Sequence, residues 1–156
     1  MTEIRLASAA LAARQAAWIA ALEPWRSLGY TSAGLGRFLR RMARGKGVLV
    51  SKQGERGPVD GVLTLQEGVL LGNFVSLLAV RPEAAGRGLG RRLIEAAAAR
   101  TAPARRWLYV SADTENAGAL AFYRKLGFRR VGRLPDLVRA GRVELLLRTD
   151  VTAAVH

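Results

Sequence analysis

Residues 77–93, LLAVRPEAAGRGLGRRL, pass from an apolar run through a glycine-spaced loop into a segment with helical periodicity. The apolar run, residues 74–80, is too short for an ordinary helix and is followed by Pro82, which is typical of a buried strand. Gly86, Gly88 and Gly90 lack Cβ atoms at alternate positions, so the main chain there can come close to a ligand. A helix that begins at such a loop presents free N–H groups and the positive end of its dipole. We therefore expect this junction to hold a phosphate or pyrophosphate.

Two well-known phosphate loops do not describe this stretch. A dinucleotide-binding loop needs G-x-G-x-x-G with an acidic residue further on, and a Walker loop needs G-K-[ST]. Neither spacing occurs here. On its own, the stretch is compatible with a phosphate site and with a plain glycine-rich turn between a strand and a helix.

Length and composition narrow the class of protein. A chain of 156 residues fits one domain, which we place at residues 1–150 with residues 151–156 as a frayed C-terminal tail. There is no cysteine and the one histidine is His156, so thiol catalysis, a histidine triad and a Cys/His metal site lack their residues. No metal is expected. Because no apolar run reaches roughly 18 residues and the start does not have the layout of a signal peptide, we expect a cytoplasmic protein without membrane contact.

The formal net charge of +13 raises nucleic acid or another polyanion as a partner. Most basic residues are arginines scattered through an alanine-rich chain. The densest group, at residues 40–46, has only Phe38 nearby to stack on a base. This pattern is more typical of a solvated helix face, so nucleic acid is not the expected partner.

The order of apolar runs and turn signals predicts seven strands and four helices. Strands are expected at residues 4–7, 47–51, 59–65, 74–80, 107–111, 129–131 and 143–147, and helices at 9–22, 32–43, 86–100 and 116–126. Residues 66–68 are expected to form a turn. This order predicts an α/β (α+β) fold, a mixed and mostly antiparallel seven-stranded sheet with helices on both faces. The parallel pair should join residues 74–80 to 107–111 through a helix.

A second informative stretch is residues 113–128, DTENAGALAFYRKLGF. Asn116 is well placed to cap a helix, and Gly127 is well placed as the left-handed residue that ends it.

Together, at this separation, the two stretches resemble the GNAT superfamily of N-acetyltransferases. The acyl-CoA loop pattern of that family, [QR]-x-x-G-x-[GA], is matched at Gly88 and Gly90, whereas Ala85 stands where the family usually has Gln or Arg. The later family motif is N-x-x-A-x-x-F-Y-x-x-x-G-F, and it is met at Asn116, Ala119, Phe122, Tyr123, Gly127 and Phe128.

The resemblance implies a GNAT-like fold with splayed central strands and an acetyl-CoA site. Loop amides would hold the pyrophosphate, and the strand end would pair its main chain with the pantetheine arm, provided that the neighbouring strand diverges near Ser111. The implied cofactor-binding residues are Leu78, Ala79, Val80, Gly86, Arg87, Gly88, Leu89, Gly90, Arg91, Asn116 and Tyr123. Because backbone amides make most of the phosphate contacts, Ala85 should weaken or slightly shift CoA binding without removing the site.

The resemblance also implies roles in catalysis. Tyr123 would act as the general acid beside the leaving CoA sulfur. For the general base the candidates are Glu67, Asp113 and Glu115, because Ser111 occupies the place where some family members have a glutamate.

We therefore expect an acetyl-CoA-dependent N-acetyltransferase. It would transfer the acetyl group to a primary amine of a small molecule or peptide by direct attack in a ternary complex, since no cysteine exists to carry an acyl group. A basic nucleic-acid-binding module and a non-catalytic CoA-binding protein on the same scaffold are the alternatives. The sequence leaves the acceptor and the base open, and it is compatible with a homodimer.

Overall fold

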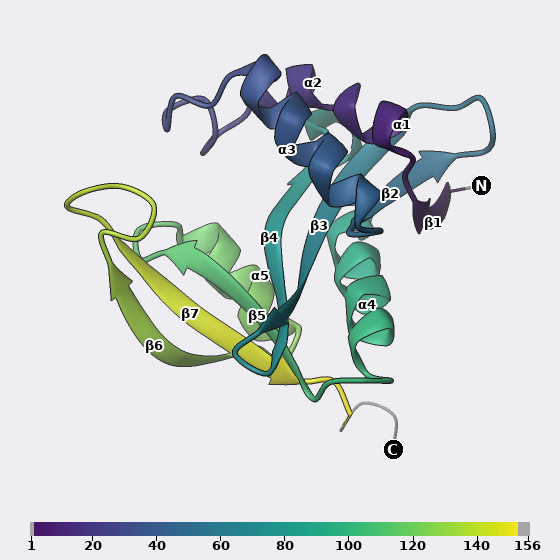
Figure 1. The fold of residues 1–156 in the computed structure, drawn as a ribbon. Helices are drawn as coiled ribbons and strands as arrows, with labels where there is room; N and C mark the ends of the chain where they lie inside the picture. The colour runs from purple at the N-terminus through teal and green to yellow at the C-terminus, as the bar shows by residue number, and fades with distance from the viewer. Residues whose placement is uncertain (1, 153–156) are drawn as a thin grey trace. The chain divides into compact units, whose positions relative to one another are not determined.

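The computed structural model describes residues 2–152 (Figure 1). The strands are β1 (Thr2–Leu6), β2 (Val48–Gln53), β3 (Val59–Val69), β4 (Gly72–Val80), β5 (Trp107–Asp113), β6 (Arg129–Pro135) and β7 (Val143–Asp150). The helices are α1 (Ala9–Ala13), α2 (Ala16–Ala20), α3 (Ser32–Arg44), α4 (Leu89–Thr101) and α5 (Ala117–Lys125), with a 3-10 turn η1 at Pro82–Ala84.

The strands form one seven-stranded sheet in the order β1-β2-β3-β4-β5-β7-β6. The pairs β1–β2, β2–β3, β5–β7 and β6–β7 are antiparallel, and β4–β5 is parallel. The parallel ladder consists of Asn73↔Leu108 and Phe74↔Tyr109, and so it ends well before either strand does. The predicted mixed, mostly antiparallel sheet with splayed central strands is therefore confirmed.

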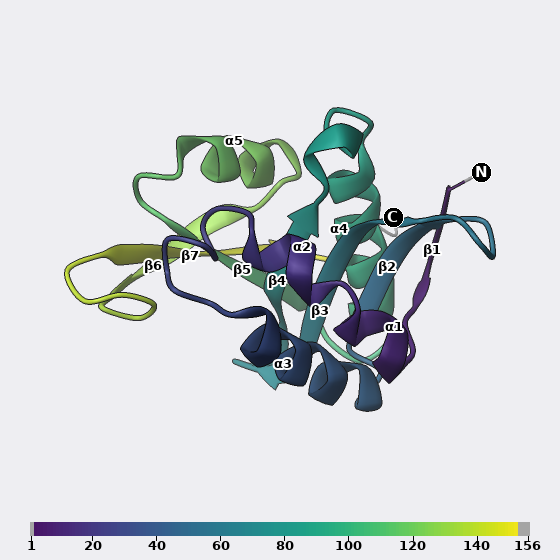
Figure 2. The ribbon, with the colours of Figure 1, turned by 90° about the horizontal axis from the view of Figure 1, so that it is seen from above.

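The chain divides into two compact units, of which the first is Met1–Gln66 with Leu77–Ala97. In this unit α1, α2 and α3 lie on one face of β2 and β3, and α4 lies on the other (Figure 2). Ile19 and Leu39 pack with Val50 in the core on the first face. On the second face the packing is tight, because a Cβ added at Gly61 would lie 2.8 Å from Leu93 Cδ1. Helices therefore cover both faces, as expected.

The single helix predicted for residues 9–22 is wrong, because the chain forms two short helices with a break at Arg14 and Gln15. The Gln15 N–H donates to the Ala12 carbonyl at 3.0 Å, an i→i−3 bond that tightens the turn. The buried Gln15 side chain donates Nε2–H to the Leu11 carbonyl and accepts Trp18 Nε1–H, both at 2.9 Å. A buried glutamine that bonds its own helix thus marks the break.

The second unit is Glu67–Ser76 with Ala98–His156. Here α5 begins as predicted, since the Asn116 side chain accepts the Ala119 N–H at 3.1 Å. The helix also ends as predicted, with Gly127 at φ +92°. The Phe128 N–H donates to the Tyr123 carbonyl at 3.1 Å, which satisfies one of the last helical carbonyls.

The turn predicted at residues 66–68 is wrong. β3 continues to Val69, and the hairpin turns at Leu70 and Leu71, whose φ angles are +49° and +61°. Two successive positive φ angles are typical of a type I′ turn, which normally carries Asn and Gly. Leucine is a poor turn residue, so the sequence did not indicate a turn here.

Leu70→Asn combined with Leu71→Gly should stabilise the protein. Both leucines are exposed, Leu71 by 86%, so little buried apolar area is lost. The new residues adopt positive φ with less strain, and we expect the free energy of unfolding to rise by about 1 kcal/mol. Denaturant unfolding measures this change, and Leu71→Val, which places a β-branched side chain at a positive φ angle, is the control that should lose stability.

Residues 151 and 152 continue the ordered chain. Val151 is buried and its N–H donates to the Arg106 carbonyl at 2.9 Å, while the Thr152 N–H donates to Asp150. The expectation of a frayed tail is therefore wrong at these two positions, and residues 153–156 lie outside the described part of the chain.

Candidate functional site

In the first unit, β4 leads through η1 into a loop that precedes α4. Gly86 and Gly88 both have positive φ, +80° and +75°. A Cβ added at either glycine would meet no atom within 4 Å, so open space lies beside this stretch of main chain. The first helical hydrogen bond of α4 runs from the Arg92 N–H to the Gly88 carbonyl at 3.1 Å, so the N–H groups of Leu89, Gly90 and Arg91 have no carbonyl of a preceding helical turn to bind. The loop thus has the geometry and the polarity to take a phosphate group.

The arginines around this loop differ in their partners. Arg91 Nε donates to Glu95 at 2.8 Å, and an Arg92 nitrogen donates to the Thr2 carbonyl at 3.1 Å. Arg87 is exposed and makes no ion pair within residues 2–152. Of these three cations, Arg87 is therefore the one most readily available to an anion bound at the loop.

The end of β4 is held firmly by Arg81, the residue that follows it. The Arg81 N–H donates to the Asp60 carbonyl at 2.8 Å, and Arg81 Nε donates to the Val59 carbonyl at 2.7 Å. The guanidinium lies 4.6 Å from the ring centroid of Trp18, a cation–π contact. Within β4, Leu77 and Ala79 are buried, so their alternation with Leu78 and Val80 fixes the strand's orientation.

In the second unit, Tyr123 is only 8% exposed. Its ring makes edge contacts with Phe122 and Phe128, with centroids 5.2 and 5.4 Å away. Burial raises the pKa of Tyr123 to about 12. The hydroxyl makes no hydrogen bond to a described residue. Tyr123 is thus a neutral phenol at physiological pH with its proton available for donation. Asn116, by contrast, is exposed and its side chain caps α5.

Arg142 forms ion pairs with two of the predicted bases, Asp113 and Glu115. Its guanidinium donates to Asp113 through Nε at 3.0 Å and Nη2 at 2.6 Å, and to Glu115 through Nη1 at 2.6 Å. These bonds, with the Glu115 N–H as a further donor, hold the pKa of Asp113 below its usual value. A carboxylate with a lowered pKa and occupied oxygens is a weak proton acceptor. The third predicted base, Glu67, is exposed near the end of β3.

Glu144 on β7 is a candidate that the sequence reasoning missed. It is half-buried, and the Ser111 hydroxyl donates to its Oε1 at 3.1 Å. Burial is the main cause that raises the pKa of Glu144. A glutamate inside the otherwise apolar run of residues 143–147 was the signal that could have drawn attention to it.

A model of the acetyltransferase (GNAT) domain matches residues 47–130, which contain the glycine loop, Asn116 and Tyr123. The chain belongs to the GNAT family. No curated protein sequence gives a significant match.

Solved GNAT structures share the fold at low sequence identity. A GNAT family acetyltransferase from Bacillus cereus has a TM-score of 0.77 and 17% identity, over 96% of this chain and 97% of its own. The structure of yncA from Salmonella typhimurium with its cofactor acetyl-CoA has a TM-score of 0.74 and 19% identity, over 97% and 94%. The ribosomal-protein-S18-alanine N-acetyltransferase from Escherichia coli has a TM-score of 0.73 and 18% identity, over 97% of this chain and 95% of its own.

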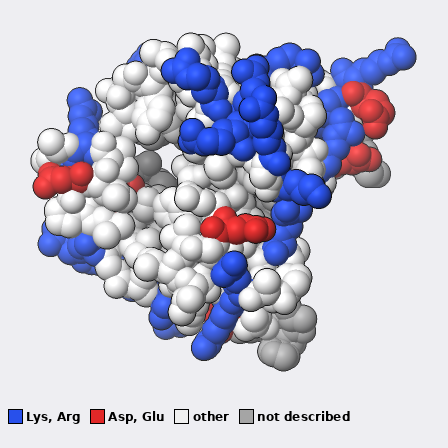
Figure 3. Space-filling model, viewed as in Figure 1, with Lys and Arg blue, Asp and Glu red and all other residues white. Residues whose placement is uncertain are grey.

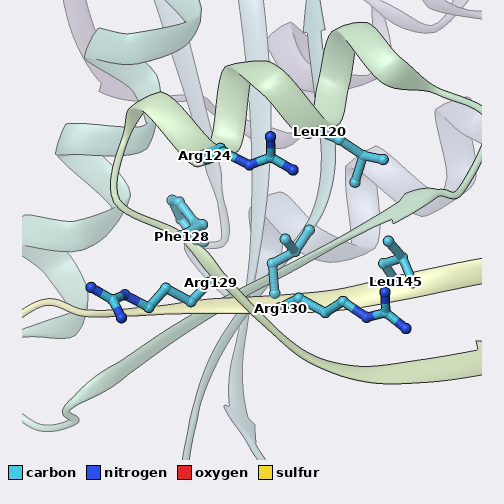
Figure 4. Close-up of a pocket in the computed structure, with 7 residues that line it drawn as sticks. Leu120, Arg124, Phe128, Arg129, Arg130 and Leu145 are labelled. Carbon is cyan, nitrogen blue, oxygen red and sulfur yellow. The ribbon is translucent and has the colours of Figure 1, made fainter.

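This GNAT chain also has a pocket of about 360 Å³ between α5, β6 and β7 (Figure 4). Its floor is apolar, and its polar groups are the side chains of Arg124, Arg129 and Arg130. Because the lining contains no carboxylate, the pocket cannot supply a proton acceptor.

One side of α3 is basic. Arg37, Arg40, Arg41 and Arg44 are exposed at helical spacing, and blue side chains gather over α3 in Figure 3. Arg41 lies over the Phe38 ring at 5.7 Å. The comparisons give no support to a nucleic-acid-binding module as the function.

Two other observations concern residues 2–152 alone. No group of three or more His, Cys, Asp and Glu side chains in them is arranged to hold a metal ion. None of the helices in this part of the chain has the length and hydropathy to cross a membrane.

Proposed function

We propose that this protein transfers the acetyl group of acetyl-CoA to a primary amine of a small molecule or peptide. The observation that carries the proposal is the open, positive-φ glycine loop between β4 and α4, in a chain of the GNAT family. The yncA structure with acetyl-CoA supports the choice of cofactor. A cytoplasmic location is part of the proposal.

In the proposed complex, the amides from Gly86 to Arg91 bind the CoA pyrophosphate, and Arg87 adds a charge-assisted contact. The main chain of Leu78, Ala79 and Val80 pairs with the pantetheine arm as a further strand would. Ala85 provides only its backbone, so the affinity rests on the amides. Asn116 contacts the arm while it caps α5.

The reaction proceeds by direct attack. The neutral amine nitrogen forms a bond to the acetyl carbonyl carbon, the tetrahedral intermediate collapses, and the C–S bond breaks with its electron pair on sulfur. Of the two protons that an ammonium acceptor loses, one goes to a base and then to solvent, and the other ends on the CoA thiol. Tyr123 donates its O–H to the sulfur as the negative charge develops there.

The raised pKa of Tyr123 determines whether it transfers its proton to the sulfur or only donates a hydrogen bond to it. A phenol with a pKa of about 12 is a weaker acid than a thiol with a pKa of about 8.5, so complete proton transfer to sulfur is uphill in a similar environment. Tyr123 therefore stabilises the thiolate mainly as a hydrogen-bond donor. It keeps its proton throughout the physiological pH range.

Binding and turnover test this proposal together. Acetyl-CoA at about 100 times its Kd should stabilise the protein by ~2.7 kcal/mol, which corresponds to a Tm rise of roughly 5–10 °C. Free CoA should appear when amines are added, and the panel should include amino acids, small amines and peptides with an N-terminal alanine, since one structural neighbour acetylates an alanine of ribosomal protein S18. A thermal shift without CoA release would instead indicate a non-catalytic CoA-binding protein. If acetyl-CoA produced no thermal shift and no amine released CoA, the proposed function would be rejected.

A further inference from the structure

Glu144 and Asp113 lie opposite each other on paired strands. Asp113 is the register partner of Glu144, and Ser111 lies on the same face of β5, two positions earlier. The neighbouring positions on β7, Leu145 and Leu147, line the pocket beneath α5. Side chains alternate along a strand, so Glu144 lies on the face of the sheet away from α5.

The two carboxylates have different partners. Arg142 donates twice to Asp113 and once to Glu115, whereas Glu144 makes no ion pair with any described residue. The charged groups that act on Glu144 are Asp113 and Arg142, and β6 places only the uncharged Leu134 opposite it. Burial and the Asp113 charge raise the pKa of Glu144, and the Ser111 hydroxyl and Arg142 oppose them in part. Two neighbouring carboxyl groups with pKa values moved in opposite directions are typical of an acid–base site.

The position of Ser111 along β5 also favours a role at a ligand site. Ser111 lies beyond Tyr109, the last β5 residue in the parallel ladder. In sheets with parallel strands, ligands bind at the carboxyl ends of the strands. The Ser111 hydroxyl holds Glu144 Oε1 at this end of β5, which leaves Oε2 without a hydrogen bond to a described residue.

We propose that Glu144, held by Ser111, is the general base that takes a proton from the acceptor ammonium, directly or through one water. This assignment rests on the acetyltransferase function proposed above. The N–H bond of the ammonium breaks, its electron pair stays on nitrogen, and the proton binds Oε2. The neutral amine then attacks the acetyl carbon, and the protonated carboxyl returns its proton to solvent. Asp113 and Glu115 remain paired with Arg142.

Glu144→Gln tests this role. It should lower kcat about 10²-fold and leave the acetyl-CoA thermal shift unchanged, because the amide keeps the shape but cannot accept the proton. Glu144→Asp should recover part of kcat. The matched control is Glu3→Gln, which removes an exposed carboxylate from β1 and should leave kcat unchanged. Removal of a partly desolvated charge should not lower Tm, so a loss of kcat would not reflect unfolding.

The pH dependence of kcat distinguishes Glu144 from Asp113 as the general base. The base must be deprotonated, so kcat should fall as the pH is lowered through the raised pKa of Glu144, above 4.5. With Asp113 as the base, the fall would come below 3.8. Ser111→Ala removes a bond that stabilises the Glu144 carboxylate, so the acid limb should move to higher pH.

Two results would overturn the assignment while the acetyltransferase function stands: a Glu144→Gln variant with full kcat, or an acid limb below 3.8 in the wild type. A carboxyl-carbon NMR titration needs no acceptor, and it would reject the assignment on its own if Glu144 titrated at or below 4.5. If the wild-type protein neither bound acetyl-CoA nor released CoA, the proposed function itself would fail.

Discussion

Replacing Tyr123 with phenylalanine should lower kcat about 10²-fold and change the affinity for acetyl-CoA little. The substitution removes one hydroxyl from a side chain that is 8% exposed and packed between Phe122 and Phe128, so the ring packing is kept. That hydroxyl makes no hydrogen bond to a described residue, so its loss leaves no partner unsatisfied in the protein. An interaction made mainly in the transition state is lost, and the loss should therefore appear in kcat rather than in binding.

Steady-state kinetics, with acetyl-CoA binding measured by calorimetry, provide the readout. Tyr30→Phe is the matched control, because Tyr30 is 48% exposed and no role is assigned to it. Equal kcat for wild type and Tyr123→Phe would exclude the phenol from the chemistry. Burial raises the pKa of Tyr123 to about 12, so Tyr123 keeps its proton near pH 9. Any fall in kcat near pH 9 must therefore come from another group, and it should be unchanged in the variant.

Gly88→Asp should weaken acetyl-CoA binding strongly, and Gly88→Asn should weaken it less. At φ +75° with no atom within 4 Å of an added Cβ, either side chain fits the free protein, and both residue types tolerate this backbone conformation. They differ by one negative charge close to the proposed pyrophosphate. With partial screening, that repulsion is worth about 2 kcal/mol, so Gly88→Asp should bind acetyl-CoA ~30-fold more weakly than Gly88→Asn.

The comparison of the two variants isolates charge from bulk. A smaller acyl thioester without the nucleotide, such as an acetylated pantetheine, should bind both variants equally because it carries no pyrophosphate. If the two variants bound acetyl-CoA with the same affinity, the phosphate would lie elsewhere, and the loop assignment would be wrong. Unfolding curves should match between the two variants, since both adopt the same loop conformation.

The parts of the fold that local sequence signals determine were predicted correctly. The cap at Asn116 and the left-handed Gly127 need only a few neighbouring residues, and the structure has both. Two of the errors, at the first helix and at the β3–β4 turn, come from longer-range effects. Packing buries the Gln15 side chain, which breaks a helix that its neighbours would continue, and strand pairing forces Leu70 and Leu71 into a turn that their own preferences oppose.

The residues of the candidate site likewise fall into those that local sequence signals predict and those whose state depends on the fold. Glycines at fixed spacing and an asparagine–tyrosine motif on one helix are local, so the sequence was enough to propose them. The state of a carboxylate depends on strand register and on which cation reaches it. The sequence gives no indication that Arg142 binds Asp113 and Glu115 while Ser111 supports Glu144. Only the three-dimensional arrangement distinguishes these acids as proton acceptors.

Arg81 has a consequence for how tightly any molecule can bind along β4. Three anchors, to the Asp60 carbonyl, the Val59 carbonyl and the Trp18 ring, fix the strand's end before a ligand arrives. Ordering a loose segment on association costs conformational entropy, and a preorganised one avoids that cost. In the proposed acetyl-CoA complex, the free energy of pairing with Leu78–Val80 would then be available for affinity, and exchange of product for fresh cosubstrate should leave this edge unchanged between cycles.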